Sequence, residues 1–220
     1  MNKVYVVTAP PSARGIYETW PECQAAVNGV KGARFMGVTS REKAESILDG
    51  EGVKLPPGRW AFTDANAAGG VGIVIVDQDA HGEATSQETS TTVQEILKDS
   101  GIPGLRTSRE VDKALGDLHN ILSEMSGFYA VLKDAVQGSK LAVVYDYKGV
   151  EKWMVEGGWK DAKSPVIAAL VTACKQQIRD RDLQVSFQHQ KGHSSTWAGR
   201  DDFARWNGRA DQLATQASKS

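Results

Sequence analysis

The amino-acid sequence predicts an α/β protein in which a small α/β domain precedes a larger domain built on a mixed five-stranded sheet with flanking helices. Short apolar runs of strand length alternate along the chain with apolar stripes of helical spacing, an order typical of helices packed on a sheet. The segment 49–58 is rich in glycine, proline and charge, a composition that suits a linker. We therefore expect domains at residues 1–48 and 59–220.

The small domain is predicted to have the order strand, strand, helix, strand, helix. The pattern Thr19-Trp20-Pro21-Glu22 is a capping box with proline in the first turn, and it predicts a helix through about Val27. A second capping box, Thr39-Ser40-Arg41-Glu42, predicts a helix to about Leu48. The expected strands are Val4–Val7, Ile16–Tyr17 and Ala33–Val38.

The larger domain is predicted to have three strands, a helix, a strand, two helices, a strand and a last helix. An apolar stripe at spacings of three and four predicts one long helix from about Ser108 to Gln137. The polar stretch Glu88–Asp117 between strand and helix has no assigned role. The expected strands are Arg59–Thr63, Gly72–Val76, Ala80–Thr89, Leu141–Tyr145 and Leu183–His189, and the later helices are Lys148–Val155, Ser164–Arg181 and one from about Asp201.

Composition limits the function classes. Lys and Arg number 26 against 27 Asp and Glu, so no global positive field attracts a polyanion and any nucleic-acid contact must be local. Cys23 and Cys174 are far apart with no second ligand nearby, which predicts neither a disulfide framework nor a zinc site. The start of the sequence lacks a signal-peptide pattern, and the longest helical apolar stretch, Val166–Cys174, has 9 residues. We expect a cytoplasmic protein with no membrane contact.

Four carboxylates occupy positions suited to a metal site. Asp64 and Asp146 each follow a predicted strand directly, where α/β sheets commonly hold functional groups. Glu124 and Asp211 flank the apolar stripes of two predicted helices. If those helices pack on the two strands, the acids converge into a set that suits Mg²⁺, and two ions about 4 Å apart can support phosphodiester hydrolysis. Taken singly, each acid is more often a turn residue, a helix cap or a solvated side chain than a metal ligand.

The larger domain resembles the type 1 ribonuclease H family over about residues 59–218. The similarity implies that Asp64, Glu124, Asp146 and Asp211 form a metal-binding catalytic set for two Mg²⁺ ions, with Mn²⁺ as a substitute, and that His193 on a loop aids proton transfer or product release. Ala65-Asn66 departs from the family's Gly-Ser, which puts substrate contacts in doubt more than chemistry. The matching motifs are Phe62-Thr63-Asp64, Asn120-Ile121-Leu122-Ser123-Glu124, Val143-Val144-Tyr145-Asp146-Tyr147, Lys191-Gly192-His193 and Asn207-Gly208-Arg209-Ala210-Asp211.

Residues 1–48 resemble the hybrid-binding, or viroplasmin-like, domain that often precedes this nuclease. The resemblance implies that Tyr5, Trp20 and Phe35 contact nucleic acid, where aromatic rings can pack on sugars or bases. This sequence lacks the family's basic first loop and its lysine pair after the residue matching Phe35. Residues 1–57 hold seven Lys and Arg against six Asp and Glu. We therefore expect weaker and less salt-dependent hybrid binding than in the family.

The resemblance implies hydrolysis of the RNA strand of an RNA/DNA hybrid, leaving 5′-phosphate and 3′-hydroxyl ends. Further nucleic-acid contacts are expected from Asn66, Asn120, Lys191 and Arg209. Two alternatives stay open: a non-catalytic hybrid-binding protein of the same fold, and a related-fold DNA nuclease of the resolvase or integrase type. The sequence leaves the oligomeric state open, with a monomer expected.

Overall fold

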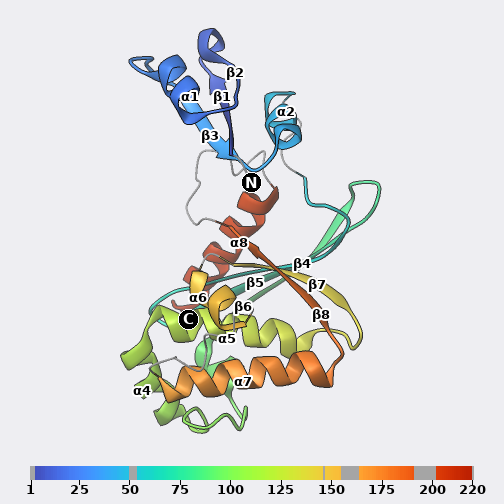
Figure 1. Ribbon diagram of the computed structural model, residues 1–220. Coiled ribbons are helices and arrows are strands. Elements are labelled where there is room, and N and C mark those ends of the chain that lie inside the picture. Colours follow the sequence, from blue (N-terminus) through green and yellow to red (C-terminus); the bar gives the residue numbers. More distant parts are fainter. Residues whose placement is uncertain (1–2, 50–53, 146, 155–163, 191–201, 220) are drawn as a thin grey trace. The chain divides into compact units, whose positions relative to one another are not determined.

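A computed structural model describes residues 3–49, 54–145, 147–154, 164–190 and 202–219 of the chain (Figure 1). The chain forms two compact units, one built on the residues up to Lys54 and the other on Leu55 to the end of the last strand together with the last helix. Each unit is described by itself. Within the described ranges, no helix is long and apolar enough to cross a membrane.

The first unit is a three-stranded antiparallel sheet of order β2-β1-β3 with two helices. Thr19 closes the predicted capping box with Glu22, which confirms that part of the prediction. The second cap was predicted one residue too early, because the Ser40 hydroxyl, 3.2 Å from the amide of Lys43, is the group that caps the helix. The elements are β1 (Val4–Ala9), the 3-10 turn η1 (Pro11–Ala13), β2 (Gly15–Tyr17), α1 (Trp20–Val27), β3 (Arg34–Val38) and α2 (Arg41–Asp49).

The second unit contains a five-stranded sheet of order β6-β5-β4-β7-β8, which confirms the predicted mixed sheet. The first three strands of the unit form an antiparallel meander, and the other two pair parallel to β4 and to each other. Parallel pairing needs a crossover connection, and helices supply it here. The strands are β4 (Gly58–Ala65), β5 (Gly70–Gln78), β6 (Ala84–Thr92), β7 (Lys140–Tyr145) and β8 (Gln184–His189).

Helices cover both faces of this sheet. Two long helices, α5 and α7, pack together beneath one face, and α8 lies on the other face (Figure 1). The main core fills the α5 side, with fully buried residues such as Phe128 and Leu132. On the α8 side, the ring of Phe203 lies edge-on to Trp60 at 5.2 Å. The helices are α3 (Val93–Leu97), α4 (Ser108–Leu118), α5 (Asn120–Asp134), α6 (Lys148–Met154), α7 (Pro165–Asp180) and α8 (Asp202–Ala217).

Glycines in β5 let α8 lie unusually close to the sheet. A Cβ added at Gly72 would stand 1.9 Å from the carbonyl oxygen of Ala210, and one added at Gly70 would stand 2.1 Å from that of Ala214. No real Cβ tolerates such distances, so any side chain at these positions would push the helix away. These two glycines therefore set the short distance between the backbone of α8 and β5.

Three predicted boundaries in the second unit were wrong. β4 extends to Ala65, so Asp64 lies inside the strand and not after it. β6 begins at Ala84 because Asp79 and Glu83 close the turn between β5 and β6 with a backbone hydrogen bond of 2.9 Å. The predicted helix 108–137 is two helices, because His119 adopts φ 47° and ψ −125°, a conformation that ends α4 before α5 begins.

Candidate active site

Two parallel strands bring the first acids to one edge of the sheet. In the β4–β7 ladder, Phe62 pairs with Val144, so the carboxyl ends of both strands reach the same edge. Asp64 is the last residue but one of β4, and its Oδ1 accepts a hydrogen bond of 2.8 Å from the amide of Ala65. Asp146 follows β7 directly in the sequence, but it lies outside the described residues.

The direction of the Asp64 side chain follows from strand alternation. Phe62 packs on the α8 side, where its ring lies 6.3 Å from that of Phe203. Thr63 faces α5, because its Cβ is 3.5 Å from where a Cβ on Gly127 would be. Successive side chains of a strand point to opposite faces, so Asp64 points to the α8 side. It is half-buried there.

Glu124 is a buried carboxylate on α5, with only 6% of its surface exposed. It lies one turn before Gly127, the residue that contacts Thr63, so it belongs to the face of α5 near the end of β4. Burial raises the pKa of the Tyr147 phenol, and the charge of the nearby Glu124 carboxylate adds to the rise. Glu124 therefore lies near both β4 and the segment that follows β7.

Asp211 is an exposed residue of α8. The residue before it, Ala210, lies directly over Gly72, which is the antiparallel partner of Asp64. The close approach of α8 to β5 therefore carries Asp211 to the level of Asp64 in the sheet. Within the described part of the chain, no three His, Cys, Asp or Glu side chains lie close enough together to hold a metal ion. Two other predicted site residues, Lys191 and His193, are outside that part.

Asn207 lies one helical turn before Asp211 and was not predicted as a site residue. It is 7% exposed, and no donor in the described part of the molecule reaches its Oδ1. Buried polar atoms normally have a hydrogen-bond partner, so this oxygen is available to a donor outside the described residues, whether from the chain or from a ligand. The signal in the sequence was its place at the start of the motif that ends in Asp211.

The residues predicted to contact nucleic acid differ in how many hydrogen bonds their side chains make within the protein. The Asn66 side chain accepts hydrogen bonds from the amides of Ala68 and Gly70, and it donates one of 3.0 Å to the carbonyl of Ala214. It thereby ties the β4–β5 turn to the end of α8. Asn120 is the first residue of α5 and is exposed.

Arg209 joins α8 to the edge strand β6. Its guanidinium makes two hydrogen bonds to the Glu88 carboxylate, of 2.9 and 2.7 Å. The Arg209 hydrogen bond lowers the pKa of Glu88, and the pKa of Arg209 is raised in turn. This ion pair was not predicted, because its members are 121 positions apart in the sequence.

The three predicted aromatic residues of the first unit form one exposed cluster, here called the aromatic patch: Tyr5, Trp20 and Phe35. The Trp20 ring lies 5.5 Å from Tyr5 and 5.4 Å from Phe35. Trp20 and Phe35 are 39% and 41% exposed, although aromatic rings of this size are usually buried. An exposed cluster of this kind marks a surface that can bind a ligand.

Few cations of the first unit are available beside this patch. The Arg14 guanidinium donates a hydrogen bond to the carbonyl of Leu48, and Arg41 pairs with Glu18 and Glu45. Two other exposed cations are Lys31, which precedes β3, and Arg34, which is the first residue of this strand and the neighbour of Phe35. The exposed Lys3 is a third cation near the patch, because its side chain and that of Tyr5 both lie within 4 Å of where a Cβ on Gly37 would be.

The first unit is similar to a known domain family. Residues 3–47 match the family model of the ribonuclease H1 N-terminal domain, which confirms the resemblance predicted for this segment. The comparison with curated proteins gave no match.

Solved structures similar to the chain include three ribonuclease H structures. Ribonuclease H1 of the halophilic archaeon Halobacterium salinarum is 14% identical over 73% of this chain and 96% of its own, with a TM-score of 0.41. LC11-RNase H1, isolated from compost, is 16% identical over 73% and 94%, with a TM-score of 0.44. The N-terminal RNase H domain of a Mycobacterium tuberculosis protein, fused to maltose-binding protein, is 16% identical over 74% and 95%, with a TM-score of 0.37.

Proposed function

We propose that this protein is a metal-dependent ribonuclease H that hydrolyses the RNA strand of RNA/DNA hybrids. The observation that carries the proposal is the placement of Asp64 at the end of β4, beside the end of β7, with the buried Glu124 on α5, the helix that packs against β4. The ribonuclease H1 N-terminal domain at residues 3–47 supports the choice of substrate. We propose Asp64, Glu124, Asp146 and Asp211 as the metal ligands.

The donor set fits a hard divalent cation. All four proposed ligands are carboxylates, and Mg²⁺ and Mn²⁺ prefer carboxylate oxygens and water. The orphaned Oδ1 of Asn207 suits a hydrogen bond from a water of such a site. When bound, a pair of ions supplies activation of the attacking water and stabilisation of the leaving oxygen, and the proposed products carry 5′-phosphate and 3′-hydroxyl ends.

The remaining residues bind substrate and move protons. We propose that His193 accepts or delivers a proton at the scissile phosphate, because an imidazole titrates near neutral pH. Asn120 and Lys191 are proposed to contact the hybrid near the cut. Asn66 and Arg209 would contact it only by exchanging the bonds that they make within the protein. The aromatic patch is proposed to bind the DNA strand through its sugars and bases.

A substrate panel tests the proposal. Purified protein is incubated with labelled RNA/DNA hybrid, double-stranded RNA, double-stranded DNA or single-stranded RNA, each with Mg²⁺, Mn²⁺ or EDTA. We expect cleavage of the RNA strand of the hybrid with either metal and none with EDTA. A hybrid that is bound but left intact would indicate a non-catalytic binding protein, and cleavage of double-stranded DNA would indicate a resolvase-like or integrase-like nuclease.

A further inference from the structure

The edge strand β6 presents a long and regular row of backbone groups. It is the last strand in the order β6-β5-β4-β7-β8, and it pairs with β5 over all nine residues, Ala84 to Thr92, without a bulge. No strand in the described ranges pairs with its outer side. Every residue from Ala84 to Ser90 is exposed. The outer amides and carbonyls of β6 are therefore open to another extended chain.

β6 also lacks the features that usually prevent strand addition. Its sequence, ATSQETSTT, contains no lysine, arginine or proline, and Glu88 is its one charged residue. The Glu88 carboxylate is held by Arg209 on the α8 side, so it does not project along the free edge as an isolated charge. Natural edge strands normally carry such residues, a bulge or a cover. Their absence here indicates an edge that is kept available.

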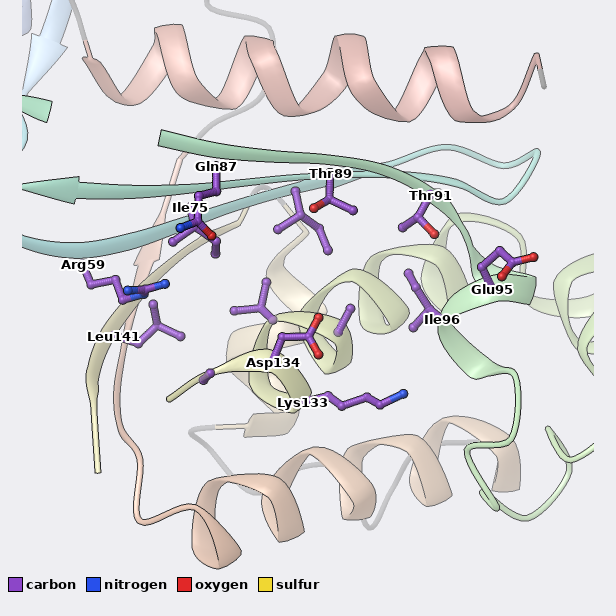
Figure 2. A pocket seen from close by; sticks show the side chains of 14 residues that line it. Arg59, Ile75, Gln87, Thr89, Thr91, Glu95, Ile96, Lys133, Asp134 and Leu141 are labelled. Carbon is purple, nitrogen blue, oxygen red and sulfur yellow. The ribbon is translucent and has the colours of Figure 1, made fainter. Parts of the chain in front are cut away.

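A cavity of about 310 Å³ lies next to β6 on the α5 side of the sheet. None of the proposed metal ligands lines it. Figure 2 shows Gln87, Thr89 and Thr91 of β6 along one side, with Arg59 and Leu141 at one end and Glu95 at the other. Apolar side chains line much of the rest: Ile73, Ile75, Ile96, Ala130, Val131 and Leu141.

We propose that β6 binds an extended segment of a partner protein as a sixth strand of the sheet. Side chains of a strand alternate with a period of two, so every second residue of the added segment would lie on the same side as Gln87, Thr89 and Thr91. Those residues of the segment are apolar and enter the cavity. Main-chain hydrogen bonds to β6 provide affinity and the cavity provides selectivity, as in other cases of strand addition.

The charged residues around the cavity also determine which charges the bound segment can carry. Arg59 is neutralised by Asp77 in an ion pair of 3.2 Å. Of the other charged lining residues, Glu95 and Asp134 outnumber Lys133. The residual negative charge favours lysine or arginine in the segment over aspartate or glutamate.

A second copy of this chain fits the edge less well. In a fully overlapping antiparallel pair of β6 strands, residue 88 is the centre, so Glu88 would lie opposite Glu88 of the copy. Each Glu88 is already paired with Arg209 of its own chain, so this contact adds no new ion pair between the copies. All nine side chains except that of Ala84 are polar, so such a pair would bury little apolar surface.

Selection from a displayed library of nine-residue peptides on the full chain tests the proposal. We expect enriched peptides to alternate apolar and polar residues, and a synthesised winner to protect the amides of β6 from hydrogen exchange. Thr89→Lys places a charge on the edge and in the cavity, and it should weaken peptide binding by at least about tenfold. Thr172→Lys, at an exposed position of α7, is the matched control and should bind as the wild type does.

Several outcomes would overturn the proposal. These are enriched peptides without alternation, binding that Thr89→Lys leaves unchanged, and a dimer of the free chain that Thr89→Lys dissociates, which would make a second copy the occupant. Circular dichroism and thermal unfolding establish that each variant is folded. Should Thr89→Lys fail to fold, Gln87→Lys, at another exposed position on the same side of β6, provides the same test.

Discussion

At the scale of single residues, the Glu88–Arg209 pair links β6 to α8. Arg209 lowers the pKa of the Glu88 carboxyl below its ordinary 4.5, so the folded state holds the ionised form more strongly than the unfolded state does. The stabilisation is therefore present above pH 4.5 and is lost as the pH falls through the lowered pKa. This pair is the clearest pH-dependent contact within the described part of the site.

We predict that Glu88→Gln removes this contribution. Chemical denaturation of the wild type and the variant at a series of pH values should show lower stability of Glu88→Gln near neutrality and a difference that shrinks below pH 4.5. A difference that is constant with pH would contradict the assignment. Glu83→Gln, at an exposed position in the turn between β5 and β6, is the control.

The backbone conformation of His119 leads to a second prediction about stability. Its φ of 47° with ψ of −125° is a conformation that glycine adopts readily and other residues adopt at a cost. His119→Gly should therefore raise the free energy of unfolding by about 1 kcal/mol. His81→Gly, at an exposed turn residue outside the positive-φ region, should bring no such gain. A loss of stability in His119→Gly would show that the histidine ring makes a necessary contact.

Contacts of single residues could be predicted from the sequence where the two partners lie close together along the chain. The Thr19–Glu22 capping box depends on residues three positions apart, and the structure confirms it. The role of Asn66 could not be predicted, because its partner Ala214 is 148 positions away. Neither spacing nor composition reveals such pairings, which exist only after the helix has packed on the sheet.

At the scale of elements, the break between α4 and α5 shows the limit of periodicity. The apolar residues Leu115, Leu118 and Leu122 continue at spacings of three and four across His119, and the break itself contains neither glycine nor proline. The pattern therefore predicts one helix. The helix α8 was predicted correctly because it buries one face, which is visible in the sequence itself.

The contact between α8 and β5 yields a paired prediction. Gly72→Ala places a Cβ 1.9 Å from the Ala210 carbonyl, so α8 must move, and we expect a loss of stability of about 1–3 kcal/mol. Because α8 also carries Asp211, cleavage of hybrid should fall as well. Gly116→Ala on the exposed side of α4 meets no atom within 4 Å, and it should stabilise the protein by about 1 kcal/mol.

Thermal and chemical unfolding of the two alanine variants measure this contrast. Equal stability of Gly72→Ala and the wild type would mean that α8 does not approach β5 as described. A loss in both variants would point to a general effect of replacing glycine rather than to the helix contact.

At the scale of the whole molecule, the low net charge predicts that electrostatic attraction contributes little to nucleic-acid binding. The net charge is −1, and the cations Arg14 and Arg41 of the first unit are engaged within the protein. Phosphate contacts generate the salt dependence of nucleic-acid binding. The aromatic patch, rather than charge, should therefore carry most of the affinity of the first unit for a hybrid.

This prediction can be measured on the full chain in an Asp64→Asn background, which keeps the hybrid intact. Trp20→Ala should weaken hybrid binding by about tenfold, the effect of losing one stacking or packing contact. Replacing both Lys31 and Arg34 by alanine should flatten the slope of log K against log salt by no more than about 2. A much larger change in the salt slope, with little effect of Trp20→Ala, would show that charge dominates.

The mixed sheet could be predicted from the alternation of apolar patterns. The strand order could not be derived from those patterns, because they identify the buried faces and not the neighbours. The position of Asp64 beside the end of β7 depends on the β4–β7 ladder, and that of Glu124 depends on the face that α5 turns to β4. Only the family resemblance selected these acids among the 27 in the sequence.

The most direct measurement compares Asp64→Asn with the wild type in cleavage of a labelled RNA/DNA hybrid in Mg²⁺. The substitution keeps the size of the side chain and removes the charge proposed to hold metal. We predict that Asp64→Asn abolishes cleavage while thermal unfolding and hybrid binding stay nearly unchanged. Cleavage by Asp64→Asn at the rate of the wild type would contradict the proposed function.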